Sequence, residues 1–232
     1  MSKNILLVGG STGIGYETAK RLQNDYNVIV ASRQEGQLSE LNVTHHKFDV
    51  MEDDISELDL PDVLHGLLYL PGTINLKPFK MIRPNIFEED MKINFFKLVE
   101  TTQGVLKKLK GADQASIVYI STVAVQLGMP FHTSVAAAKG AIEGFARSLA
   151  AEYAPQFRVN VIAPSLANTP LADKLLGNEK KKEKMDARHP LKRVAEASDI
   201  AEMTSYLLTD KSSWMTGQVI GLDGGMSSLN IS

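Results

Sequence analysis

The stretch "LLVGGSTGIG" at residues 6–15 decides the fold that this sequence predicts. Its apolar start is typical of a buried strand, and a segment with helical spacing follows at residues 13–25. Gly9, Gly13 and Gly15 lie at the junction. Glycine is needed where a chain turns sharply out of a strand and where its backbone approaches a pyrophosphate closely. The first N–H groups of the helix would then point at the phosphates. An ordinary glycine-rich turn is the alternative, but the strand–loop–helix context favours a dinucleotide site.

Short apolar runs alternate with helical segments along the whole chain. The runs that we interpret as strands are 4–9, 27–32, 43–48, 63–70, 115–121, 158–163 and 218–223. Helical spacing is found at 13–25, 85–111, 134–153 and 197–210. This alternation is typical of a parallel sheet covered on both faces. We therefore predict an α/β fold, a Rossmann-type doubly wound parallel sheet of about seven strands with helices on both faces, in a single domain over residues 1–232.

One charged run, "NEKKKEKMDARHP" at residues 178–190, interrupts the pattern. A solvated helix with both charge signs on its surface explains this run. A mobile lid over a substrate site is a second interpretation, compatible with the first. We therefore predict a substrate-lid segment near residues 170–195.

The composition excludes several classes of function. The net charge of −2 over 232 residues argues against nucleic acid or an anionic membrane as a partner. The chain has no cysteine, and its histidines lack ligand spacing with nearby acids, so we predict no metal site. No apolar run approaches the roughly 18 residues needed to cross a bilayer, and an apolar strand begins at the very N-terminus. We expect a soluble, cytoplasmic protein.

The end of the second strand indicates which dinucleotide is bound. An acidic residue about twenty positions after the glycines binds the adenosine ribose of NAD. Here Arg33 follows Gly15 by eighteen residues, and Ser32 precedes it. A guanidinium attracts a 2′-phosphate that a carboxylate would repel, and Ser32 adds a hydroxyl donor. We therefore favour NADP over NAD, although an exposed surface arginine would look the same.

Several further motifs, in order along the chain, resemble those of the short-chain dehydrogenase/reductase family. They are "GGSTGIG" (9–15), "FDV" (48–50), "MKINFF" (91–96), "IVYISTVA" (117–124), "RVNVIAPSLANTPL" (158–171) and "WMTGQVIGLDGG" (214–225). The resemblance implies a cofactor site at Gly9, Ser11, Thr12, Gly13, Ile14, Gly15, Ser32, Arg33, Asp49, Val50, Gly72, Asn94, Lys139, Pro164, Ala167 and Thr169. It also implies a small-molecule substrate and a homodimer or homotetramer.

The chain departs from the family pattern in three places. Only fifteen residues separate Arg33 from Asp49, too few for a full helix and a strand. The loop that usually reads N-N-A-G is "YLPG" at residues 69–72, where Pro71 stiffens the backbone. Ser165 replaces a common glycine.

The resemblance implies catalytic roles for Asn94, Thr122 and Lys139. Thr122 stands at the serine position, whereas the neighbouring Ser121 would face the other way on a strand. The family's tyrosine lies four residues before its lysine, one turn away on the same helix face. That position is Val135, and valine has no proton to give.

Two hypotheses remain open. In the first, the protein is an NADP-dependent reductase with a substitute proton donor, for which His132, Tyr69 and solvent are candidates. In the second, it binds NADP without turnover and acts as a sensor, scaffold or partner subunit. Loss of a positioned general acid typically lowers a rate by about 10²–10⁴.

Overall fold

The computed structural model describes residues 2–230 and contains a seven-stranded sheet in the order β3-β2-β1-β4-β5-β6-β9. Its strands are β1 Asn4–Val8, β2 Asn27–Ser32, β3 Thr44–Lys47, β4 Gly66–Tyr69, β5 Ala115–Ile120, β6 Phe157–Pro164 and β9 Val219–Leu222. Every neighbouring pair is parallel. The predicted doubly wound sheet is confirmed, and its seven strands fall in the seven apolar runs.

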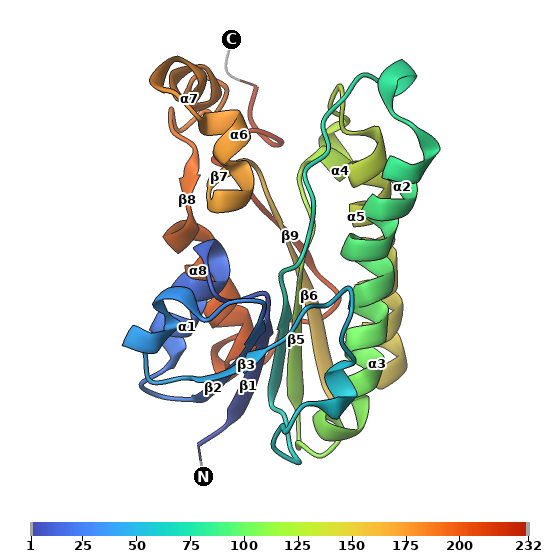
Figure 1. Ribbon diagram of the computed structural model, residues 1–232, viewed down its shortest axis with the longest axis vertical. Helices are drawn as coiled ribbons and strands as arrows, with labels where there is room; N and C mark the ends of the chain where they lie inside the picture. Colours follow the sequence, from blue (N-terminus) through green and yellow to red (C-terminus); the bar gives the residue numbers. More distant parts are fainter. Residues whose placement is uncertain (1, 231–232) are drawn as a thin grey trace.

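Helices cover both faces of this sheet (Figure 1). Helices α1 (Gly13–Leu22) and α8 (Ala197–Leu208) pack together on one face, and α3 (Lys97–Leu109) and α5 (Thr133–Tyr153) lie on the other. Strand β5 is consequently buried along its whole length. Each fully buried leucine or isoleucine stabilises the fold by roughly 1.5–3 kcal/mol, which explains why the strands are almost continuously apolar.

The connections are mostly short. They contain η1 Gly36–Glu40, η2 Ile55–Glu57, η3 Phe79–Met81, α2 Pro84–Met91, η4 Lys92–Phe96, α4 Ala124–Leu127, β7 Ala167–Asn168, η5 Pro170–Ala172, α6 Asp173–Leu176, α7 Glu179–Asp186, β8 Ala195–Glu196 and η6 Asp210–Ser212. The helix predicted at 85–111 is interrupted by η4, a π-helical turn. Only η1 and β3 occupy the short stretch between Arg33 and Asp49, as its length predicts.

The strand order reverses direction at β1, which pairs with β2 on one side and β4 on the other. The loops that follow β1 and β4 meet there. A Cβ atom added to Gly9, whose φ is +82°, would lie 3.0 Å from the Cδ atom of Pro71. Ligands of doubly wound sheets bind outside the carboxyl ends of the strands at such a switch point. The fold therefore favours a ligand site at the carboxyl ends of β1 and β4.

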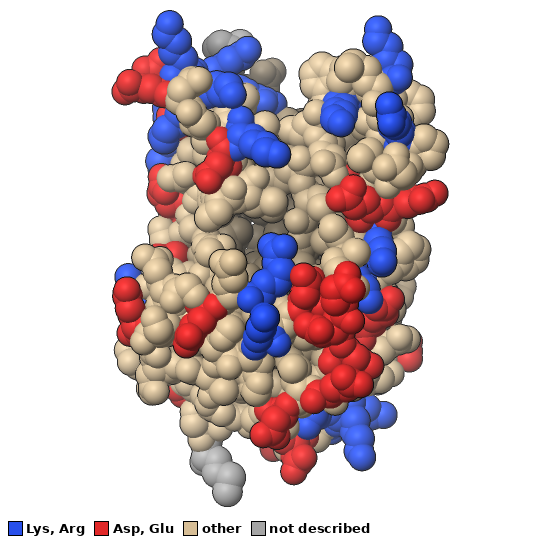
Figure 2. All heavy atoms as spheres, viewed as in Figure 1, with Lys and Arg blue, Asp and Glu red and all other residues tan. Residues whose placement is uncertain are grey.

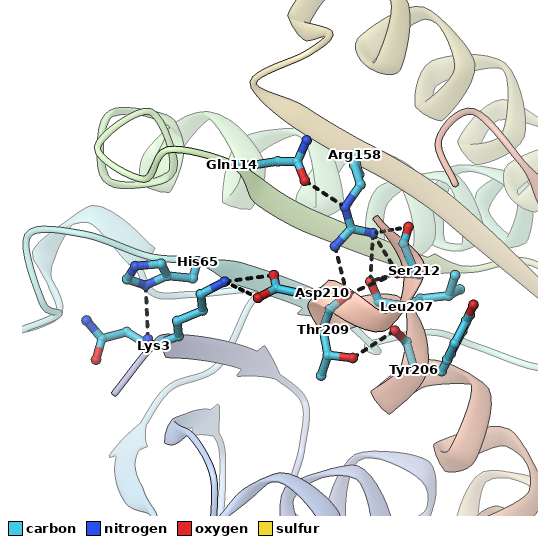
Figure 3. Close-up of polar contacts among 10 residues, drawn as sticks. Lys3, His65, Gln114, Arg158, Tyr206, Leu207, Thr209, Asp210 and Ser212 are labelled. Carbon is cyan, nitrogen blue, oxygen red and sulfur yellow. Dashed lines mark hydrogen bonds and ion pairs between the residues drawn. The ribbon is translucent and has the colours of Figure 1, made fainter. Parts of the chain in front are cut away.

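A buried cation lies at the opposite, amino-terminal ends of the strands (Figure 3). Arg158, at the start of β6, is only 4% exposed. Its guanidinium donates to the carbonyl oxygens of Leu207, Thr209 and Ser212 at 3.0–3.2 Å. These oxygens lie at the C-terminus of α8, the negative end of the helix dipole. Arg158 therefore holds the C-terminus of α8 against the sheet, at the strand ends farthest from the switch point.

Candidate active site

A cavity opens at the carboxyl ends of β4, β5 and β6, and Figure 2 shows the surface hollowed between two upper lobes. It brings together nine of the predicted residues: Ile14, Gly72, Thr122, His132, Val135, Lys139, Pro164, Ala167 and Thr169. One wall comes from the predicted lid segment and includes Leu171, Leu175, Met185, Arg188 and His189. Most of the other lining side chains are apolar, so the few polar groups in the cavity carry its chemistry.

Basic side chains gather on both lobes beside the hollow (Figure 2). The exposed residues Lys77, Lys80 and Arg83 precede or begin α2 on one side. Lys181 and Lys184 lie on α7 on the other. Although the whole chain carries a charge of −2, the two lobes would attract anionic molecules to the cavity.

The glycine loop has the shape that a phosphate cradle requires. Gly13 has a φ of +53°, and a Cβ atom on Gly15 would lie 2.5 Å from the Cα atom of Gly10. Thr12 precedes α1 without a side-chain cap, and the first turn of α1 has no acidic residue. The N-terminus of α1 is therefore open to a negatively charged ligand. These features fit a dinucleotide pyrophosphate.

Lys139 is buried within α5, with 9% of its surface exposed. Its Nζ atom donates a 2.9 Å hydrogen bond to the carbonyl oxygen of Ile120, at the end of β5. Burial lowers the pKa of Lys139 to about 8, and the negative charge of Asp90 opposes this effect. The lysine is therefore held in place, and its charge is sensitive to pH near neutrality.

Asn94 lies behind the cavity in the π-helical turn η4. Its Nδ2 atom donates to the Oγ1 atom of Thr73 at 2.9 Å and to the carbonyl oxygen of Asp90 at 2.8 Å. Within this turn, the carbonyl oxygen of Ile93 accepts a 2.8 Å hydrogen bond from the hydroxyl of Tyr69. Tyr69 thus supports the turn that positions Asn94.

Thr122 and Ser121 follow β5 but differ in their surroundings. The buried hydroxyl of Ser121 donates to the Oε1 atom of Glu143 at 2.7 Å. The hydroxyl of Thr122 is half-buried and accepts a 3.3 Å hydrogen bond from the main-chain N–H of Ala124. Its proton remains free to bond a ligand, which favours Thr122 over Ser121 for contact with a substrate.

Val135 lines the cavity and is buried, so no side-chain hydroxyl occupies the position four residues before Lys139. Two of the substitute donors, Tyr69 and His132, differ in their position relative to the cavity. Burial raises the pKa of Tyr69, its hydroxyl is bonded to Ile93, and it does not line the cavity; this candidate is therefore wrong. His132 does line the cavity, and its Nδ1 atom lies 2.7 Å from the carbonyl oxygen of Pro130.

The predicted adenosine end of the site lies beyond the cavity, after β2 and β3. Arg33 is exposed, as a phosphate ligand should be. Ser32 is buried, and its hydroxyl donates to the carbonyl oxygen of Gln34 at 2.9 Å while meeting the Nε2 atom of His45 at 3.0 Å. Its proton is already used, so the expectation that Ser32 donates to a phosphate does not fit this arrangement. Asp49 accepts a hydrogen bond from the main-chain N–H of Met51 at 3.0 Å.

Of the remaining predicted residues, Thr169 borders the glycine loop, whereas Val50 packs against the hydrophobic core. A Cβ atom on Gly13 would lie 3.2 Å from the Cγ2 atom of Thr169, so the segment after β6 closes over the loop.

Within residues 2–230, no group of three or more His, Cys, Asp or Glu side chains could hold a metal ion. In the same part of the chain, every helix is too short or too polar to span a bilayer.

A family model described as Enoyl-(Acyl carrier protein) reductase matches residues 8–227. The chain belongs to the short-chain dehydrogenase/reductase family. It is 31% identical to a tropinone reductase homologue of Arabidopsis thaliana, over 97% of this chain and 92% of that protein. L-xylulose reductase of Bos taurus is 26% identical, over 96% of both chains.

Solved structures share this fold. The aldohexose dehydrogenase of Thermoplasma acidophilum superimposes with a TM-score of 0.90 at 24% identity, over 100% of this chain and 96% of that one. The protein ElxO with NADP bound superimposes with a TM-score of 0.89 at 24% identity, over 99% of this chain and 100% of that one.

The resemblance to short-chain dehydrogenases/reductases did not draw attention to Asp90, which the structure places beside Asn94. Asp90 is fully buried, and its Oδ1 atom accepts hydrogen bonds from Thr73 and Asn75. Its Oδ2 atom has no hydrogen-bond partner among the described residues. One signal was available in the sequence, because an acid four positions before Asn94 shares its helix face.

Proposed function

We propose that this protein is an NADP-dependent short-chain dehydrogenase/reductase that transfers a hydride between the cofactor and a small carbonyl or alcohol substrate. One observation carries the proposal. A Cβ atom on Gly72 would lie 2.9 Å from the Oδ1 atom of Asn94 and 3.4 Å from the Nζ atom of Lys139. The two polar groups thus flank one glycine at the cavity, beside the loop that fits a pyrophosphate. The printed names of the relatives, among them reductases of small carbonyl compounds, support the same reaction class.

Each polar residue has a role that its geometry supports. The bound cofactor supplies or accepts the hydride. Lys139, with its ammonium near the cavity, would hold the nicotinamide ribose. Thr122 would orient the substrate oxygen with its free proton, and Asn94 would anchor the polar chain behind Lys139. Pro164, Ala167 and Thr169 would border the nicotinamide.

Arg33 supports NADP rather than NAD. It follows β2 without a neighbouring acid at the strand tip, and its exposed guanidinium is free to bind a 2′-phosphate. The basic lobes beside the cavity add a favourable potential for the more highly charged cofactor.

Val135 supports the second candidate function, an NADP-binding member of the family that is impaired in turnover and acts as a sensor, scaffold or partner subunit. Nothing in its side chain can replace a hydroxyl. Lys139 and Asn94 would hold the cofactor in either case.

Binding and turnover together test these proposals. NADPH and NADH are titrated by nicotinamide fluorescence, and ketones, aldehydes and quinones are then screened with wild type and Val135→Tyr. We expect NADPH to bind more tightly, Arg33→Ala to abolish the preference, and wild type to turn over. Equal affinities for both cofactors would overturn the NADP assignment. Turnover gained only in Val135→Tyr would support the impaired form.

The assembly, the lid and the location follow from the same proposal. We expect a homodimer or homotetramer acting on a small molecule, with no nucleic-acid or membrane partner, in the cytoplasm. Small residues on α5, including Ala136, Ala137 and Gly144, would let a second copy approach closely. The segment near 170–195 would close over the bound substrate, because it already forms one wall of the cavity.

A further inference from the structure

A buried histidine and a serine form a pair inside the cavity. His189 follows α7 and is 2% exposed, yet both it and Ser165 line the cavity. The Nε2 atom of His189 lies 2.9 Å from the Oγ atom of Ser165. Its Nδ1 atom lies 2.9 Å from the carbonyl oxygen of Met185. The hydroxyl, the ring and the carbonyl therefore form one continuous chain of hydrogen bonds.

The carbonyl of Met185 fixes the direction of this chain. A carbonyl oxygen can only accept, so the Nδ1 atom of His189 carries a proton. In the neutral ring, Nε2 then accepts the proton of Ser165. In the imidazolium, Nε2 donates to the hydroxyl instead. The pair can consequently pass one proton in either direction between the ring and the hydroxyl of Ser165.

The hydroxyl of Ser165 arises beside the residues of the proposed active site. The main-chain N–H of Val123 donates to the carbonyl oxygen of Pro164 at 3.1 Å, which joins the ends of β5 and β6. This bond holds together the two segments, after β5 and after β6, that carry Thr122 and Ser165. Both line the same cavity as Lys139 and Val135.

We propose that Ser165, backed by His189, exchanges the proton with the substrate oxygen that Val135 cannot exchange. This inference rests on the proposed function, because it assigns a donor for the same hydride transfer. Ser165 is the catalytic residue in this scheme, and His189 acts through it.

In the reducing direction, the cofactor supplies the hydride and Ser165 supplies the proton. The hydride supplied by the cofactor forms the new C–H bond, so the cofactor is oxidised and the carbonyl carbon reduced. The C=O electron pair moves to the oxygen, which takes the proton of the Ser165 hydroxyl. The serine oxygen takes the proton from Nε2 of the His189 imidazolium, leaving a neutral ring that still donates from Nδ1 to Met185. A proton from the solvent then returns to Nε2 of His189.

His132 is the competing donor, because it lines the same cavity and its Nε2 atom would likewise be the free nitrogen of a neutral ring. His189 differs in being buried and in contacting a hydroxyl that itself reaches the cavity. Burial keeps the ring fixed, which a positioned donor requires.

The test combines substitutions in two backgrounds, with 1-phenyl-1,2-propanedione and 9,10-phenanthrenequinone as probes. In wild type, His189→Gln and Ser165→Gly should each lower kcat about 100-fold or more, with NADPH affinity changed less than threefold. In the Val135→Tyr background, where tyrosine supplies the proton, the same substitutions should lower kcat less than fivefold. Equal losses in both backgrounds would indicate a merely structural role and overturn the inference.

Two other outcomes would also overturn it, and they separate it from the proposed function. If turnover survives in His189→Gln but is lost in His132→Gln, the protein is still an oxidoreductase, but Ser165 and His189 are not its proton donor. A probe reduced by Val135→Tyr but not by wild type, with NADPH bound by both, shows that the pair delivers no proton and favours the impaired family member.

A second readout needs neither cofactor nor turnover. In ¹⁵N spectra of histidine-labelled protein, the resonances of His189 are those that His189→Gln removes. We expect its neutral ring to carry the proton on Nδ1, and Ser165→Gly to shift its Nε2 resonance. A neutral ring protonated on Nε2 would contradict the chain of hydrogen bonds on which the inference depends.

Discussion

The carboxylate of Asp90 raises the pKa of the Lys139 ammonium against the larger effect of burial, although no ion pair joins the two side chains within the described residues. The balance leaves the pKa of Lys139 at about 8. A lysine that binds cofactor with such a pKa makes the affinity depend on pH in an accessible range.

We expect NADPH affinity to fall as pH rises through about 8, the pKa of Lys139. Below that pH the ammonium donates a charged hydrogen bond to the ribose, and above it the positive charge is lost. The decrease should be about tenfold, as expected for a hydrogen bond to a charged group. Fluorescence titrations between pH 6.5 and 9.5 measure it. Lys139→Met should bind more weakly without this pH dependence; the same fall in that variant would assign the titration to another group.

Asp90→Asn should move the midpoint of that pH dependence to lower pH. The substitution removes the charge that raises the pKa of Lys139 and keeps a side chain of the same shape. Glu89→Gln is the matched control, because Glu89 is exposed on the same helix. Parallel titrations of the two variants measure the difference, and a midpoint unchanged in Asp90→Asn would remove the proposed coupling.

Gly72→Ala should weaken NADPH binding by about tenfold or more. The new methyl would lie 2.9 Å from the Oδ1 atom of Asn94, and Asn94 has little room to move because Thr73 and Asp90 hold its Nδ2 atom. In Gly221→Ala, a Cβ atom would meet only the Oγ atom of Ser227, at 3.9 Å, so its affinity should match wild type. Fluorescence titration and a urea unfolding curve separate lost binding from lost stability; unchanged affinity in Gly72→Ala would dissociate this glycine from the cofactor.

Arg158→Met should lower the free energy of unfolding by roughly 2–4 kcal/mol, because the buried carbonyls at the end of α8 lose their donors. The folded variant should bind NADPH like wild type, since Arg158 lies at the opposite edge of the sheet from the cavity. Arg158→Lys keeps the charge but cannot reach all three carbonyls of Leu207, Thr209 and Ser212, so it should be intermediate. Urea unfolding measures the series, and Arg158→Lys as stable as wild type would contradict the geometric argument.

The sequence predicted the features of this fold that depend on neighbours in the chain. Apolar runs located the seven strands of the main sheet but not the short strands β7 and β8, and the glycine loop located the switch point after β1. The family motifs added Thr122 and Lys139, which line the cavity. The π-helical turn at Asn94 could not be read in the same way, because it depends on the hydroxyl of Tyr69, which comes from a different strand.

The role of His189 was hidden for a similar reason. It lies in a run that reads as a solvated charged helix, and α7 is indeed largely exposed. Its burial arises from distant partners, since Ser165 follows β6, and a Cβ atom added to Gly224, after β9, would lie 3.7 Å from the His189 ring. Such contacts between segments far apart leave no periodic signal in the sequence. The family resemblance identified Val135 at the tyrosine position, whereas the folded cavity is needed to see which side chains lie near enough to donate a proton in its place.

Strand β6 separates two demands on this protein along its own length. Near the start of β6, Arg158 holds α8 against the sheet. Just beyond the last residue of the strand, Pro164, Ser165 lines the cavity. Because the two ends of the strand contact different parts of the protein, residues at the cavity can be exchanged without removing the hydrogen bonds of Arg158 at the end of α8.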